Sequence, residues 1–480
     1  MAGFRLGVFA GVALGLAGLA LDASAATALP IQGPRDAAFV DTFRELVETD
    51  SSITTGSCTL VADKVEARLR AAGYGDKEIT RFAVPDHPKE GGLVVVLRGA
   101  ESARRPILLL GHIDVVTARR EDWVRDPYTM IEEGGWFYGR GTSDMKSMDA
   151  VWIDTMIRLR REKTPPRATV KMALTCGEEA SGAFNGAQWL SNNRRDLIDA
   201  AFALNEGGGG LTDGKGLSEG GRLMGLGFGV GEKAYQDFTL TVTNPGGHSS
   251  QPVPDNAIVT LARALEKVQA YQFPVQFNDT TRAFFTRSGA LRADETGKAM
   301  VALAANPADT AAEAVLNRDK MLHSLLRTTC VPTMVSAGHA LNALPQRATA
   351  NVNCRIFPGN TGEETRAALV AAIGDPAVAV EDRVKDKPIA KAPPLDPKVM
   401  GPIEALSAKY FPGVPVIPSM STGASDAVYT GAVGIPTYGV PGIWSNPDGN
   451  GIHGLNERIE VQSLLTGRAY LYDLVKVYAY

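Results

Sequence analysis

The chain has 480 residues and six histidines, and its 49 Lys and Arg against 53 Asp and Glu give a formal net charge of −4 at pH 7. Apolar residues make up 44% and charged residues 21%, ordinary values for a globular protein that exclude a disordered or fibrous chain. The mild acidity argues against a nucleic-acid partner, because nucleic-acid binders usually concentrate basic residues on one surface. A chain of this length rarely has a single core, so we expect two domains.

Residues 1–25 have the composition of a secretory signal peptide. Arg5 supplies the positive charge, residues 6–21 are apolar or small, and Ala23-Ser24-Ala25 offers a cleavage site of small residues. The alternative is a transmembrane anchor, but the apolar run is shorter than the roughly 20 residues that a span needs. We therefore expect an exported protein, periplasmic or secreted, with no membrane span after cleavage.

Four cysteines could form two disulfides in an oxidising compartment. No Cys-x-x-Cys pair is present, which argues against a redox or zinc-ribbon site. Cys330 and Cys354 belong to a predicted strand pair, 328–337 and 347–356, and could face each other across it. The sequence alone leaves open whether they are bonded.

The first part of the chain alternates helical patterns with short apolar strands, as α/β domains do. Apolar spacing predicts a helix over residues 59–72, for which Ser57 is a suitable N-cap. We expect buried strands at 106–116, 169–175 and 200–204, because each is a short apolar run followed by a polar or glycine-rich turn.

The pattern changes after the glycine-dense stretch 207–231. Residues 235–243 alternate apolar and polar side chains, which predicts a strand with one solvated face. We then expect a helix capped by Asp255 and reaching about residue 270, the strand pair, and a helix opened by a capping box of Thr361 and Glu364. A Pro- and Lys-rich passage, 385–397, is typical of a return linker before the α/β pattern resumes at Val399 and ends in a long helix from Val461.

This order predicts one domain inserted into another. Residues 26–232 and 389–480 are expected to form an α/β domain, and residues 233–388 an inserted α+β domain. No internal repeat or low-complexity tract was found in the sequence.

Residues that could carry chemistry stand in short motifs near the ends of the predicted strands. They are His112 with Asp114, Asp144 in a glycine-flanked turn, Glu178 with Glu179, Glu206, and the single histidines His248 and His453. Taken singly, each has a structural explanation: a satisfied strand-end pair, an N-cap, a solvated acidic turn or a structural histidine.

Their joint placement is more informative. His112, the pair Glu178–Glu179, and Glu206 lie near the carboxyl ends of three separate predicted strands, the edge where open α/β sheets bind ligands. Imidazoles combined with several carboxylates suit ions such as Zn²⁺. A bridging carboxylate can hold two such ions about 3.5–4 Å apart.

A competing motif, Gly216-Leu217-Ser218-Glu219-Gly220, matches the Gly-x-Ser-x-Gly elbow of serine hydrolases. That elbow needs a strand before the serine and a helix after it. Loose glycine-rich sequence flanks Ser218 on both sides, so we expect no catalytic role for it.

Together the motifs resemble the M20 family of dinuclear zinc metallopeptidases and amidohydrolases, from about Val47 to the C-terminus. The matching stretches are Leu108–Val116 (LLLGHIDVV), Trp123–Tyr128 (WVRDPY), Gly135–Lys146 (GWFYGRGTSDMK), Thr175–Gly182 (TCGEEASG), Gly246–Pro252 (GGHSSQP), Ser421–Ala427 (STGASDA) and Gly451–Glu457 (GIHGLNE). One departure is Ser147, where the family commonly has glycine. The resemblance implies a zinc-peptidase-like α/β catalytic domain, with a mixed central sheet and helices on both faces, and an inserted α+β, ferredoxin-like lid. We call residues 233–388 the lid.

The resemblance also implies a role for each motif residue. Asp144 would bridge two zinc ions, with His112 and Glu206 completing one site and Glu179 and His453 the other. Asp114 would orient His112, and Glu178 would be the general base that takes a proton from a metal-bound water. His248 would stabilise the oxyanion, in this family often in the active site of a partner subunit.

Substrate contacts and substrate class follow from the same resemblance. Asn342 and Arg355 match positions that contact the substrate carboxylate, although a surface strand charge is an equally good explanation of Arg355, and Gly423 matches a substrate-binding position. Glu206, where family dipeptidases tend to carry Asp, and an extra lid stretch, 273–327, resemble the carboxypeptidase S and N-acyl-amino-acid hydrolase branch.

We therefore expect an exported enzyme with two Zn²⁺ per chain, or other divalent transition metals. It would release a C-terminal residue from peptides or, as the alternative, remove the acyl group from N-acyl amino acids; a dipeptidase fits less well. A homodimer through the lid is compatible with the sequence. The non-catalytic alternative is a periplasmic binding protein on a hydrolase scaffold.

Overall fold

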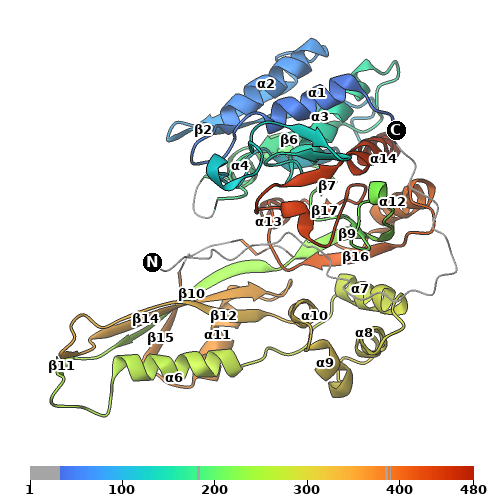
Figure 1. Cartoon of the computed structure of the whole chain (residues 1–480). Helices are drawn as coiled ribbons and strands as arrows, with labels where there is room; N and C mark the ends of the chain where they lie inside the picture. Colours follow the sequence, from blue (N-terminus) through green and yellow to red (C-terminus); the bar gives the residue numbers. More distant parts are fainter. Residues whose placement is uncertain (1–32, 181–183, 384–387, 390) are drawn as a thin grey trace.

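The computed structural model describes residues 33–180, 184–383, 388–389 and 391–480, and shows a broad body from which the lid extends as a long arm (Figure 1). The expected signal peptide, residues 1–25, lies outside the described residues, as does part of the expected linker at 385–397. In the part of the chain that is described, no helix is long and apolar enough to cross a membrane.

A large mixed sheet forms the centre of the body. Its inner strands are parallel, and antiparallel neighbours flank them on both sides. In spatial order the strands are β1 (Ile79–Val84), β2 (His87–Leu97), β6 (Val170–Thr175), β3 (Ile107–His112), β7 (Phe202–Asn205), β17 (Thr437–Gly439), β9 (Leu223–Glu232), β8 (Gly209–Thr212) and β18 (Trp444–Ser445), with β16 (Val416–Ser421) paired to β9. The three buried strands expected from the sequence are thus β3, β6 and β7.

Helices cover both faces of this sheet because its inner strands are apolar on both sides. Ile107 and Leu109 of β3 pack into one core, and Leu108 and Leu110 pack into another. The first face carries α1 (Ala37–Val47), α2 (Cys58–Ala71), α3 (Lys146–Arg161), α12 (Pro397–Tyr410) and α14 (Val461–Ala479), and the second carries α4 (Gly186–Asn193) and α5 (Arg195–Ile198), with α13 (Ala427–Ala432) beside α4. The expected mixed sheet with helices on both faces is confirmed.

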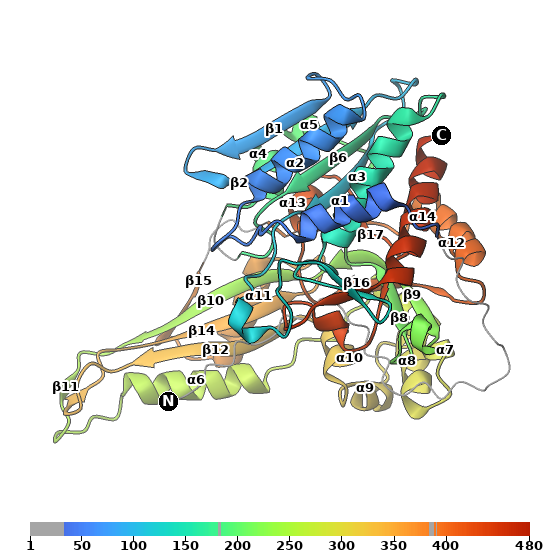
Figure 2. The same ribbon diagram turned by 45° about the horizontal axis from the view of Figure 1, so that its top comes forward.

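The lid contains a four-stranded antiparallel sheet with two helices packed on it. Its elements are β12 (Thr329–Ala337), β14 (Arg347–Ile356), β10 (Ala234–Thr243) and β15 (Val378–Asp382) in spatial order, with α6 (Ala257–Ala270) and α11 (Gly362–Ile373). Along β10 the burial alternates, as the sequence pattern predicted. A short strand pair, β11 (Gly247–His248) with β13 (Ala343–Leu344), forms the tip farthest from the body (Figure 2).

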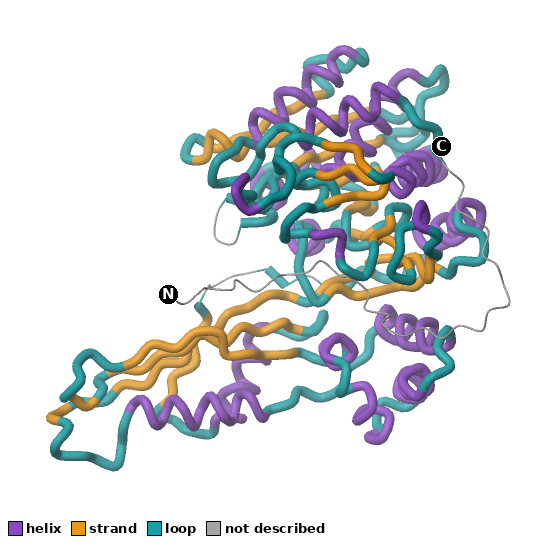
Figure 3. The backbone as a smooth tube through the Cα atoms, in the orientation of Figure 1, coloured by secondary structure: helices purple, strands orange, loops and turns teal. Residues whose placement is uncertain are grey.

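The extra lid stretch, 273–327, forms a separate group of helices rather than a longer lid sheet (Figure 3). The helices are α7 (Asp279–Ala290), α8 (Glu295–Ala305), α9 (Thr310–Leu316) and α10 (Lys320–Leu325). Their core includes Phe285 and Leu303 together with Ile417 and Met420 of β16. These helices therefore fasten the lid to the body next to the loop that follows β16.

A second, three-stranded sheet lies in the body, and three short 3-10 turns complete the described elements. They are β19 (Arg458–Glu460), β5 (Trp136–Tyr138) and β4 (Ile131–Glu133), with 3-10 turns at Arg120–Asp122, Leu217–Glu219 and Gly449–Gly451.

Helix caps agree with the sequence at two places and differ at a third. Ser57 caps α2, and Thr361 with Glu364 forms the expected capping box of α11. The cap of α6 is Asn256, not Asp255: the Asn256 side chain accepts from two helix amides, whereas Asp255 accepts from Asn244. Asn and Asp are equally good caps, so two candidates in adjacent positions could not be separated from sequence.

All four cysteines are in disulfides. Cys330–Cys354 joins β12 to β14, which resolves the bond that the sequence left open. Cys58–Cys176 joins α2 to the loop after β6, across 118 residues of sequence.

Candidate active site

Six of the side chains singled out in the sequence lie together at the carboxyl edge of the central sheet. They are His112 at the end of β3, Asp144 just before α3, Glu178 and Glu179 after β6, Glu206 after β7, and His453 in the loop before β19. The strand predicted at 106–116 ends at His112, where the chain leaves the sheet toward this cluster. Convergence at one sheet edge, expected from the strand order, is therefore observed.

Asp144 connects two groups of possible metal ligands. One of its carboxylate oxygens lies 3.2 Å from Nε2 of His112, and the other lies 3.2 Å from Nε2 of His453. Glu206 is 3.6 Å from the first imidazole, and Glu179 is 2.9 Å from the second. Within each group the donor atoms lie within 4.8 Å of one another. Asp144 is thus not the N-cap of α3, a position that Met145 occupies.

Burial and mutual repulsion control the electrostatics of this cluster. Burial raises the pKa of Glu178 well above its usual value, and Glu206 and Glu179 add to the shift. Burial also raises the pKa of Glu179, to about 7. Burial alone would lower the pKa of His453, but its contacts with Asp144 and Glu179 raise it to about 10.

The donor set fits divalent metal ions. Four carboxylates face two imidazoles, an excess of acidic groups that a buried site can keep ionised only with additional positive charge. Mixed nitrogen and oxygen donors suit Zn²⁺ and similar ions. The two oxygens of Asp144 face different histidines, the arrangement that a carboxylate shared by two ions needs.

The orientation of His112 depends on the main chain of Asp114. Nδ1 of His112 donates to the Asp114 carbonyl oxygen at 3.1 Å, which directs Nε2 toward the cluster. The Asp114 carboxylate is farther from Nδ1, at 3.7 Å, and instead accepts from the amides of Glu178 and Glu179 at 3.4 and 3.0 Å. The expected carboxylate–imidazole contact is therefore replaced by one from the carbonyl, and the carboxylate holds the next loop.

Sequence reasoning missed the residue that shapes the Asp144 loop. The buried Glu457 carboxylate accepts from the amides of Gly141, Ser143 and Asp144 at 2.8–3.0 Å and pairs with Arg140 at 2.7 Å. In the sequence, Glu457 stands out only as the last residue of the GIHGLNE motif, with no role assigned to it. Bonds to main-chain amides require no particular partner residue, so the sequence carries no signal for this role.

A second missed carboxylate, Asp426, lies behind the loop that carries Glu178 and Glu179. It is buried and accepts from Thr175 at 2.8 Å and from Asn185 at 2.7 Å. Burial raises its pKa to about 6. Its position in the STGASDA motif was the only signal available.

The structure does not bring the expected lid residues to the cluster. His248 and Asn342 are exposed at the lid tip, where the Asn342 carbonyl accepts from the Ser249 amide. Arg355 lies near the other end of β14, with its guanidinium 4.8 Å from the Tyr235 ring centre. Most of β14, roughly 27 Å of extended chain, separates the two, so Asn342 and Arg355 of one chain cannot bind the same carboxylate. Gly423 follows β16 in the body.

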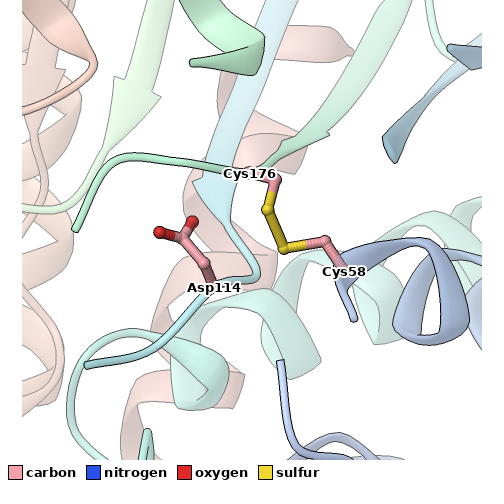
Figure 4. A group of neighbouring side chains, drawn as sticks. All are labelled: Cys58, Asp114 and Cys176. Atoms are coloured by element: carbon pink, nitrogen blue, oxygen red, sulfur yellow. A yellow bond between two sulfur atoms is a disulfide. The ribbon is translucent and has the colours of Figure 1, made fainter. Parts of the chain in front are cut away.

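Two other arrangements of chemistry-bearing residues have a structural explanation in the fold. Ser218 lies in a 3-10 turn followed by strand β9, so the strand–serine–helix elbow is absent there. Cys58, Cys176 and Asp114 have metal-like spacing, but the two sulfur atoms are bonded to each other (Figure 4).

A mixed α/β body with two donor groups that share one carboxylate defines a protein suited to binding divalent metals. Residues 108–477 match the model of peptidase family M20/M25/M40, most of the chain, and the protein belongs to this family of hydrolytic enzymes. The family resemblance and the fold class expected from the sequence are confirmed.

Two curated relatives and one solved structure illustrate the relationship. The chain is 28% identical over 404 residues to the N-fatty-acyl-amino acid synthase/hydrolase PM20D1 of Homo sapiens, covering 83% of this chain and 79% of the relative. It is 27% identical over 399 residues to the probable carboxypeptidase S-like 2 of Dictyostelium discoideum, covering 80% and 74%. In fold it is similar to the M20 family metallo-carboxypeptidase Sso-CP2 from Sulfolobus solfataricus, with a TM-score of 0.65, 18% identity, and 93% and 100% of the two chains covered.

Proposed function

We propose that this protein is an exported, zinc-dependent hydrolase that cleaves an amide bond whose amine side carries a free α-carboxylate. The observation that carries the proposal is the carboxylate of Asp144, whose two oxygens face His112 and His453, with Glu178 beside them. Peptides cleaved at the C-terminus are the first substrate class, and N-acyl amino acids are the alternative.

Each group of ligands would hold one ion. His112 and Glu206 would bind the first together with one oxygen of Asp144, and Glu179 and His453 would bind the second with the other oxygen. When bound, such ions polarise the substrate carbonyl and lower the pKa of water toward neutrality.

Glu178 would move the proton. It lies in one group with His112 and Glu179 but is not needed to complete either pair of ligands around Asp144. In our proposal its carboxylate accepts a proton from the attacking water and donates that proton to the amine nitrogen as the C–N bond breaks. The amides of Glu178 and Glu179, held by Asp114, keep this carboxylate next to the ligands.

The lid tip would act on a second copy of the chain. The ten-residue strand β10, roughly 33 Å long, separates His248 from the body. Nδ1 of His248 accepts from the Ser250 amide at 3.2 Å, which leaves Nε2 as the donor of a neutral ring. A donor at this position would suit the oxyanion of the tetrahedral intermediate, and Asn342 at the same tip would contact the substrate.

The lid also offers a surface for a homodimer. β12 is an edge strand of the lid sheet, and Val331, Met334 and Val335 on it are 54%, 64% and 67% exposed. An edge strand with exposed apolar side chains is a favourable surface for another chain. In this arrangement Arg355 and Gly423 would contact substrate in their own subunit.

Export is supported by two independent features. The signal-like composition of residues 1–25 is one, and the two disulfides are the other, because disulfides persist in oxidising compartments.

The names of the relatives divide between the two substrate classes, N-acyl amino acids and carboxypeptidase substrates. A panel of N-blocked dipeptides, N-acyl amino acids of increasing chain length and free dipeptides would decide between them, with each carboxylate substrate paired with its methyl ester. We expect chelator-sensitive hydrolysis of one of the first two classes and at least a hundredfold loss on esterification. An absence of chelator-sensitive hydrolysis across the panel would overturn the proposal in favour of the binding-protein alternative.

A further inference from the structure

The Cys58–Cys176 disulfide lies directly behind the proposed catalytic loop. Cys176 is the first residue after β6 and stands two positions before Glu178, and both sulfur-bearing residues are almost fully buried. Figure 4 shows the bond between α2 and this loop, with Asp114 beside it. The bond therefore joins the N-terminal part of the body to the segment that carries the proposed base.

The same loop is also held by hydrogen bonds. The Cys176 carbonyl accepts from the Gly186 amide at 2.7 Å, and the Asp114 carboxylate accepts from the amides of Glu178 and Glu179. Gly177, between them, has φ +93°, and a Cβ there would lie 1.9 Å from the Phe184 carbonyl oxygen. The backbone at Gly177 is thus closely packed against Phe184, and the disulfide is the attachment that joins this loop to α2.

The segment that carries Cys58 also contacts the other ligand loop. Lys146, two residues after Asp144, is fully buried and donates to the Thr49 carbonyl oxygen at 2.8 Å. Between Thr49 and Cys58 the chain is closed into a compact turn, in which Asp50 accepts from Ser52, Thr55 and Ser57. We call residues 49–58 the brace. It is attached to the Asp144 loop through Lys146 and to the Glu178–Glu179 loop through the disulfide.

We propose that the brace, through the Cys58–Cys176 bond, positions Glu178 and Glu179 relative to Asp144. The inference rests on the proposed function. Asp144 and Glu179 meet at His453, and small displacements of a ligand loop weaken metal binding and misplace a general base. Cys58 and Cys176 are in this view positioning residues, which act through the loop rather than on the substrate.

The test is the full-length double variant Cys58→Ala with Cys176→Ala. The matched control is Cys330→Ala with Cys354→Ala, which removes a bond between two strands that are already paired in the lid. Zinc affinity is measured by competition with a chromophoric chelator, and kcat and KM are measured at a temperature where circular dichroism shows all three proteins folded. We expect the first variant to lose at least tenfold in zinc affinity and in kcat, with KM within twofold. The control should stay within twofold of the wild type in zinc affinity, kcat and KM.

A variant that keeps wild-type zinc affinity and kcat would overturn the inference and leave the bond as a stabilising cross-link only. If wild-type protein neither binds zinc nor hydrolyses the panel, the proposed function fails instead, so the two failures are distinguishable.

If the double variant does not fold, the control protein serves as the starting material, because Cys58–Cys176 is then its only disulfide. A water-soluble phosphine reduces the bond to two thiols and becomes the phosphine oxide, with the oxygen taken from water. Loss of kcat and zinc affinity in the still-folded reduced protein, reversed on reoxidation, would support the inference; unchanged values would overturn it.

Discussion

The body cluster and the lid tip are built in opposite ways, although our proposal assigns both to one reaction. In the body, Asp144 and its neighbours are held by Glu457, by the Asp114 carboxylate and by a disulfide. At the tip, His248 is exposed and its side chain forms a hydrogen bond with Ser250, two residues along the chain. Metal ligation requires fixed donors, whereas a donor delivered to the substrate must arrive from outside. The comparison predicts that changes in the body alter metal binding and chemistry in every subunit, while changes at the tip act between subunits.

The largest effect is expected from Glu178→Gln. Loss of the proton acceptor should lower kcat by about 10²–10⁴-fold, while the five proposed ligand residues keep zinc bound, since Glu178 is outside both groups around Asp144. Steady-state kinetics and metal analysis on the same sample measure both quantities. Substantial remaining activity would remove Glu178 from the mechanism, and lost zinc would reassign it as a ligand.

A somewhat smaller effect is expected from His248→Ala. Removing one oxyanion donor typically costs about 10²–10³-fold in kcat, and because the side chain is exposed, zinc content and thermal stability should not change. Mixing this variant with Glu178→Gln tests whether the tip acts between subunits. In a mixed dimer one site would combine an intact Glu178 with an intact tip from the other subunit, so activity should return. No recovery in confirmed mixed dimers would show that the tip does not act between subunits.

Residue type and strand order were enough to predict the body cluster. Contacts and distances between segments far apart in the chain could not be predicted from the sequence. His112, Glu179 and Glu206 could be placed together because carboxyl ends of parallel strands meet at one edge. The Cys58–Cys176 bond could not, because disulfide connectivity is not encoded in spacing. The tip is a related case: its motif was visible, but its distance from the body depends on the length of β10, and in our proposal it acts on a second copy of the chain.

Lys233, at the junction of the body and the lid, should make the free energy of unfolding depend on pH in a defined direction. Its side chain is fully buried and donates to Ser324 and Thr329 at 3.1 Å each. Burial lowers its pKa from 10.5 to about 7, and Arg355 and Arg327 contribute. The unfolded chain therefore binds one more proton between about pH 7 and 10.5, and wild-type stability gains from this group as pH rises through that window.

Lys233→Met removes this dependence. The difference in unfolding free energy, wild type minus variant, should rise by roughly 2–4 kcal/mol between pH 7 and pH 10. Urea unfolding at several pH values measures it, with Lys320→Met, which replaces an exposed lysine in the same way, as the matched control. A flat difference for Lys233→Met would show that its ammonium remains charged when buried.

The smallest effect is expected from Ser218→Ala. Ser218 belongs to the body but lies outside the metal cluster, in a 3-10 turn whose amide donates to Glu460 at 2.7 Å. That bond uses the main chain, so removal of the hydroxyl should leave kcat and zinc content unchanged. The free energy of unfolding should stay within about 0.5 kcal/mol of the wild-type value. Activity assays with the preferred substrate of the panel are sufficient. If Ser218→Ala abolished turnover while zinc stayed bound, a serine nucleophile would have to replace the proton transfer assigned to Glu178, and the contrast between a metal-holding body and an oxyanion-binding tip would no longer describe the reaction.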